Sequence, residues 1–160
     1  MIRILFDILR LRSGPQDLPA GTGLAIILVA AWLAQGLLTD QVLNEAESAP
    51  RSLFAVLVQV GAVIALLKLS NRAARVPQTI SALAGTGFIF GLLAMLLVLQ
   101  LDPQQPKPGL ALAYLGLFVW SLMVDGHIYR HALSIKMSLG VLVAVLIFAA
   151  NYTLMRAIFG

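Results

Sequence analysis

Residues 125–131, Asp-Gly-His-Ile-Tyr-Arg-His, form the segment richest in side chains that could do chemistry. His127 and His131 are four residues apart, so both imidazoles share one face of a helix, an adequate spacing for two metal ligands. A catalytic metal also needs a third ligand and a general base, and Asp125 is the only carboxylate nearby. An H-E-x-x-H motif is absent because position 128 is isoleucine.

Three interpretations of this segment stay open. The first is a turn at Asp125 and Gly126 that joins two helices, with Tyr129 and Arg130 anchored at headgroup level. The second is a contact to a lipid phosphate or a partner through Arg130, His127, His131 and Asp125. The third is a metal site. No residue is assigned a catalytic role, and neither a metal nor a cofactor is predicted.

Polar side chains within the apolar stretches are the second group of candidates. Gln59 lies nearest the middle of its stretch, and Asn151 lies about two-thirds of the way along another. Each amide could make an interhelical hydrogen bond, and the two together could line a polar cavity. Every acidic residue is expected near a membrane interface, so no buried charge marks a proton pathway.

The composition determines which elements must carry these residues. Of 160 residues, 60% are hydrophobic and 11% are charged, against roughly 45–50% and about 25% in a soluble domain. So small a chain cannot bury this excess, which excludes a soluble enzyme and a nucleic-acid-binding domain. We predict an all-α integral membrane bundle of five transmembrane helices, with spans at about 20–39, 52–70, 78–101, 108–125 and 135–156.

An amphipathic helix is expected before the first span, within residues 1–19. Arg3, Asp7 and Arg10 share one face of this helix, and apolar side chains fill the other. We expect it to lie in the membrane interface and to end at Gly14 and Pro15, in a Pro/Gly linker. Residues 20–160 then form one transmembrane domain.

The distribution of Lys and Arg predicts the orientation of the chain. Eight of the eleven lie in the amino-terminal segment and in the second and fourth loops, and the other three are Arg51, Lys107 and Arg156. By the positive-inside rule the amino terminus is cytoplasmic and the carboxyl terminus external. The first loop, with Glu45 and Glu47, is expected outside.

Small residues predict how the helices pack. Gly87 and Gly91 form a G-x-x-x-G pair in the third span, which lets helices approach closely in lipid. We expect this helix at the centre of the bundle. The alternative is a homodimer seam.

The layout resembles bacterial members of the Yip (Ypt-interacting protein) family of small membrane proteins. The resemblance covers roughly residues 20–156 and rests on five spans, a cytoplasmic amino terminus and the stretch from Trp120 to Gly126-His-Ile-Tyr-Arg130. The Asp-Leu-Tyr-Gly-Pro motif of eukaryotic members is absent. The resemblance implies a five-helix bundle that acts through protein or lipid partners.

Three functions follow from these observations. The leading one is a non-enzymatic scaffold or accessory subunit of the bacterial inner membrane, in contact with lipids and with a membrane-protein partner or a second copy, and not with nucleic acid. The alternative is a small transporter or lipid-handling protein with a polar cavity among the third, fourth and fifth spans. A membrane-embedded enzyme would require Asp125, His127 and His131 to converge.

Overall fold

The computed structural model describes residues 1–42, 49–100 and 107–160, and within them the chain is all helical with no strand. Its elements are, in order, α1 (Ile2–Leu9), η1 (Pro15–Asp17), α2 (Thr22–Val42), α3 (Ala49–Leu69), η3 (Ala73–Arg75), α4 (Val76–Val98), α5 (Pro108–Leu133) and α6 (Met137–Phe159). The five helices α2 to α6 are each long and apolar enough to cross a membrane. The predicted all-α membrane bundle is therefore confirmed. Glu45 and Glu47 lie outside the described residues.

The bounds of α5 correct the turn expected at Asp125 and Gly126. The helix begins with Pro108 in its first turn and continues to Leu133, and it ends because Ser134 adopts the left-handed conformation (φ 53°). Asp125 therefore lies eight residues inside the helix, about 12 Å from its end at the usual helical rise. The loop that joins α5 to α6 is at residues 134–136 instead.

Helix α4 is central, because it packs against α1, η1, α2, α3 and α5. Its residues from Thr79 to Thr86 are all buried. A Cβ atom placed on Gly87 would lie 2.9 Å from the Trp32 ring, and one on Gly91 would overlap the Gln35 side chain. The G-x-x-x-G face thus receives α2 of the same chain.

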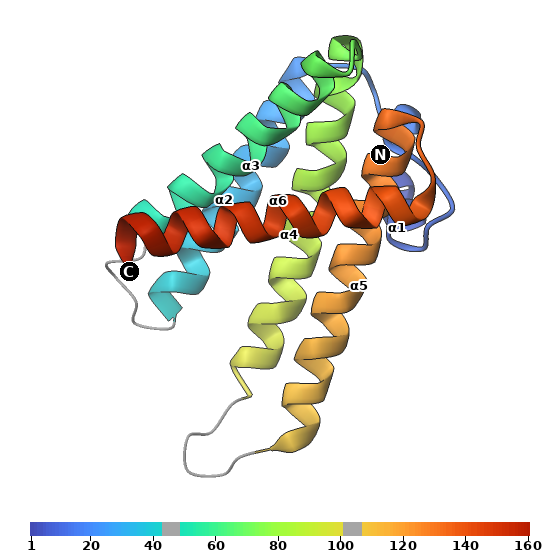
Figure 1. The fold of residues 1–160 in the computed structure, drawn as a ribbon. Helices are drawn as coiled ribbons and strands as arrows, with labels where there is room; N and C mark the ends of the chain where they lie inside the picture. Colours follow the sequence, from blue (N-terminus) through green and yellow to red (C-terminus); the bar gives the residue numbers. More distant parts are fainter. Residues whose placement is uncertain (43–48, 101–106) are drawn as a thin grey trace.

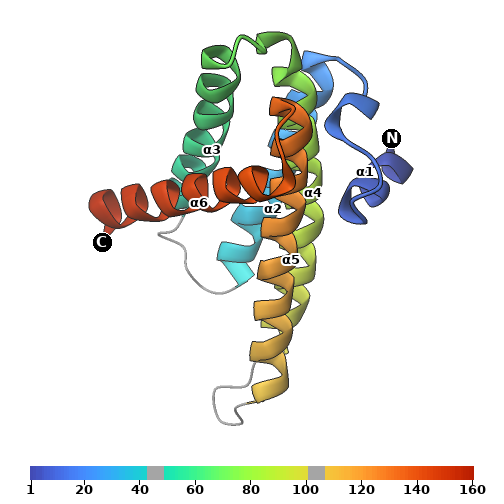
Figure 2. The ribbon, with the colours of Figure 1, turned by 45° about the vertical axis from the view of Figure 1, so that its right-hand side comes forward.

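Helix α6 takes a different course from the other helices. It crosses α5 and runs over to α3, roughly crosswise to the paired helices α4 and α5 (Figures 1 and 2). The crossing with α5 depends on two glycines. A Cβ on Gly126 would lie 2.8 Å from the Val141 Cα, and a Cβ on Gly140 would lie 3.0 Å from the Arg130 Cβ. Glycine at both positions lets the two backbones meet closely.

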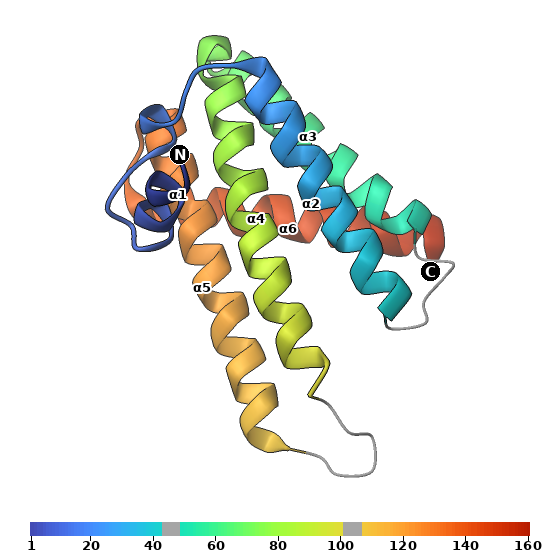
Figure 3. The same ribbon diagram turned by 180° about the vertical axis from the view of Figure 1, so that it is seen from behind.

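The amphipathic amino-terminal segment packs against the bundle. Helix α1 and η1 lie beside α4 and α5 (Figure 3), where Leu5, Ile8 and Leu9 are buried. The apolar residues Ile2 and Phe6 remain exposed. The expected helix end at Gly14 and Pro15 is wrong: α1 ends at Leu9, and its chain reverses through Leu11, which has a φ of 59°.

Candidate functional site

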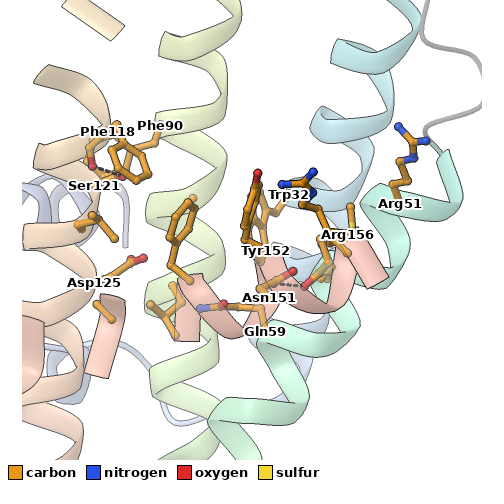
Figure 4. Close-up of a pocket in the computed structure, with 18 of the residues that line it drawn as sticks. Trp32, Arg51, Gln59, Phe90, Phe118, Ser121, Asp125, Asn151, Tyr152 and Arg156 are labelled. Carbon is orange, nitrogen blue, oxygen red and sulfur yellow. Dashed lines mark hydrogen bonds between the residues drawn. The ribbon is translucent and has the colours of Figure 1, made fainter. Parts of the chain in front are cut away.

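A cavity of about 620 Å³ lies where α6 leaves α5 and crosses to α3. Side chains of all five long helices line it (Figure 4). Its volume is within the range of roughly 300–1,000 Å³ that is typical of small-molecule sites. The cavity thus has the size of a ligand site. It exists because α6 crosses from α5 to α3 and forms one of its walls.

Six aromatic side chains line the cavity. They come from every long helix except α3: Trp32 from α2, Phe90 from α4, Phe118 from α5, and Phe148, Tyr152 and Phe159 from α6. Phe118 and Phe148 pack edge to face with ring centroids 5.1 Å apart, which joins α5 to α6. Phe159 packs in the same manner on Phe54, which joins α6 to α3. Rings that hold the helices together therefore also form the walls.

Amide side chains line the cavity where α3, α5 and α6 face one another. The Gln59 amide nitrogen donates to the Tyr129 hydroxyl at 3.0 Å, and the Asn151 amide nitrogen donates to the Ala55 carbonyl at 2.9 Å. The two amides predicted to share a polar cavity thus lie on the wall of one cavity. Its lining also includes α2 and α3, in addition to the third, fourth and fifth spans that the sequence suggested.

Asp125 lines the same cavity from α5. It was expected in a turn at an interface, and the structure places it in α5, eight residues before the end of the helix. No Lys, Arg or His in the described ranges lies within 4.0 Å of its carboxylate, and no hydrogen bond to it is present there. An ionisable side chain inside a membrane protein is a strong indication of function. Sequence reasoning missed this role because Asp-Gly is typical of a turn.

Arg51 and Arg156 lie at the other end of the cavity, near the end of α6. The Arg51 guanidinium donates to the Phe159 carbonyl at 3.2 Å, which ties the start of α3 to the end of α6. Figure 4 shows both arginines on the opposite side of the cavity from Asp125. The cavity is therefore acidic at one end, basic at the other and aromatic between them.

The other candidates of segment 125–131 point away from this cavity. The His127 ring nitrogen Nε2 is 3.0 Å from the Ser13 carbonyl, so it carries the proton and donates to the amino-terminal segment. The His131 ring packs against that of His127, with centroids 4.6 Å apart. Arg130 is half-buried beside Gly140. The enzyme hypothesis requires Asp125 and the two histidines to converge. In the structure they do not, because the histidines lie away from the cavity that Asp125 lines.

The described residues do not form a set of metal ligands. No group of three or more His, Cys, Asp or Glu side chains comes together among them. Asp125 lies on a different face of α5 from the two histidines, because residues two positions apart on a helix do not face each other.

Comparison with known proteins finds no match to a family model, to a curated protein or to a solved structure.

Proposed function

We propose that this membrane protein binds a lipid-like amphiphile in the cavity lined by helices α2 to α6. The observation that carries the proposal is a cavity of about 620 Å³ with six aromatic rings along its wall and charged side chains only at its two ends. Apolar walls with a few polar groups are typical of sites for small organic ligands. This corresponds to the lipid-handling function that the sequence suggested as an alternative.

The proposed orientation places the amino terminus in the cytoplasm of a bacterium, with the chain in its inner membrane and the carboxyl terminus outside. Contacts among the segments expected on the cytoplasmic side support it. The Arg75 guanidinium donates to the His131 and Ala132 carbonyls at 3.0 and 2.9 Å, and the Gln78 amide donates to the Leu18 carbonyl at 2.7 Å. Arg75 also donates to the Ser134 hydroxyl, so the amino-terminal segment, η3 and the α5–α6 loop meet at one end of the bundle.

The scaffold or accessory role and the Yip-like relationship stay predictions from the sequence. The packing of α4 bears on how a second copy could bind. Trp32 and Gln35 of the same chain occupy the face of Gly87 and Gly91. A homodimer would therefore use a different surface.

The test is to fill the cavity and measure what the purified protein retains. Ala55→Phe places a ring in the cavity from α3, whereas the matched variant Ala65→Phe places the same ring on an exposed position of the same helix. Lipids that co-purify in mild detergent are quantified by mass spectrometry. We expect Ala55→Phe to lose at least about 90% of a stoichiometric amphiphile, a change in affinity well above the tenfold that corresponds to about 1.4 kcal/mol.

Ala65→Phe should retain that amphiphile. Equal retention by both variants, with each running as the wild type does on gel filtration, would contradict the proposal. So would a wild-type protein that retains no amphiphile and binds none that is added back.

A further inference from the structure

Within the described residues, the amide side chains on the cavity wall keep free acceptor oxygens. The amide nitrogens of Gln59 and Asn151 each donate within the protein, and the Ser121 hydroxyl donates to the Phe118 carbonyl at 2.7 Å. In the described ranges no hydrogen bond engages the side-chain carbonyl oxygens of Gln59 and Asn151. Each amide also keeps its second N–H, so a ligand group that donates hydrogen bonds finds acceptors at this wall, and the selection of its charge falls to other groups.

Asp125 adds a carboxylate to these acceptors. Tyr129 follows it by one helical turn and receives the hydrogen bond from Gln59, so Gln59 approaches the face of α5 that carries Asp125. No cationic side chain of the described residues pairs with this carboxylate. Burying such a charge without a partner is costly, and a ligand cation would offset that cost.

The aromatic wall is also suited to a cation. Trp32, Phe90, Phe118 and Phe148 line the cavity together with Asp125. Ring faces carry a partial negative charge and attract organic ammonium groups that have lost their water. Carboxylate, amide oxygens and rings thus all favour one kind of ligand group.

The arginines do not oppose this arrangement. Both lie near the end of α6, and Arg156 follows the cavity-lining residue Ala144 by twelve positions, or about 18 Å along the helix axis. Arg51 already donates to the Phe159 carbonyl. The Asp125 end of the cavity therefore keeps its acidic character.

We infer that the amphiphile carries a protonated amine, which pairs with Asp125 while its apolar part lies along the aromatic wall. This inference rests on the proposed function and adds the chemical class of the ligand.

The experiment compares three probes that have the same chain of twelve carbons and end in an ammonium, a hydroxyl or a carboxylate group. Each carries bromine on the chain, and the full protein is held in nanodiscs of zwitterionic lipid. Trp32 lines the cavity, so a bound probe quenches its fluorescence, and Trp32→Phe identifies the signal that comes from this residue. Hydrogen bonds to a charged group predict that the ammonium probe binds at least about tenfold more tightly than the alcohol.

Asp125→Asn should abolish the preference for the ammonium probe over the alcohol. Asp125→Glu should preserve the preference, and Asp7→Asn, which changes a carboxylate on α1 away from the cavity, should have no effect. If Asp125→Asn keeps the preference for ammonium, or if the three probes bind the wild type equally, the inference is wrong. Failure of the proposed function looks different, because Ala55→Phe would then leave the quenching by every probe unchanged.

Discussion

Single residues of α5 serve different surfaces depending on their position around the helix. Asp125 faces the cavity, and Tyr129 faces α3. On another side of the helix, Trp120 donates to the Leu9 carbonyl and His127 donates to the Ser13 carbonyl, both in the amino-terminal segment. These positions follow from a period of 3.6 residues, which brings residues four apart to the same face. A segment that looks like one cluster in the sequence is therefore split between two surfaces.

Tyr129→Phe tests the polar contact that links α5 to α3. The change removes the hydroxyl that accepts from Gln59, and such interhelical bonds contribute on average about 0.6 kcal/mol and seldom above about 1.7 kcal/mol. We expect a loss of stability within that range, measured by thermal or denaturant unfolding in detergent. Tyr114→Phe on the exposed part of the same helix should be neutral, and a loss equal to that of Tyr129→Phe would show that the contact contributes nothing specific.

At the scale of elements, the crossing of α5 and α6 is the contact on which the cavity depends. Gly126 lies against the backbone of Val141, and Gly140 lies against Arg130. These neighbours include backbone atoms, which cannot rotate away as a flexible side chain can. An added methyl group must therefore push α6 away from α5.

Gly126→Ala is expected to destabilise the fold by about 1–3 kcal/mol, the usual cost of overpacking. The matched variant is Gly116→Ala, ten residues or nearly three turns earlier on α5, where a Cβ atom meets no heavy atom within 4 Å. That change should leave stability unchanged or raise it slightly, because alanine favours a helix. Thermal unfolding measures both, and similar midpoints for the two variants would rule out close backbone packing at Gly126.

The sequence predicts the elements well and their arrangement less well. Five apolar stretches were sufficient to identify α2 to α6, because the requirement to cross lipid acts locally on each stretch. The end of α5 was misplaced because Asp-Gly favours a turn locally, whereas packing of Gly126 against α6 keeps the helix intact. Gln59 and Asn151 could be picked out as polar residues in apolar spans. The aromatic wall could not, because its rings come from separate helices that only the course of α6 brings together.

For the whole molecule, two groups of contacts define two ends. At one end the amino-terminal segment, η3 and the α5–α6 loop are joined through Arg75 and Gln78. At the other, the Arg51 guanidinium and the Phe54 ring hold the end of α6 against the start of α3. Helix α6 therefore links these two groups of contacts.

Reporter fusions test which end faces the cytoplasm. A reporter fused to Met1, or inserted at residues 134–136, should be active in the cytoplasm, and a reporter fused after Gly160 should be active outside. The reason is that Lys and Arg gather in segments retained on the cytoplasmic side. Insertion at residues 70–72, near η3, provides a control that should agree with Met1. Detection of both termini on one side would contradict five crossings.

The diagonal course of α6 also has a consequence for biosynthesis. Ribosomes deliver the chain from its amino terminus, so α6 reaches the membrane after α2, α3, α4 and α5. Until α6 packs, the rings of Phe118 and Phe90 and the carboxylate of Asp125 face an open groove, since three of the six aromatic rings of the wall belong to α6 itself. For the proposed amphiphile, this order of insertion leaves a sideways path from the bilayer into the cavity until α6 packs.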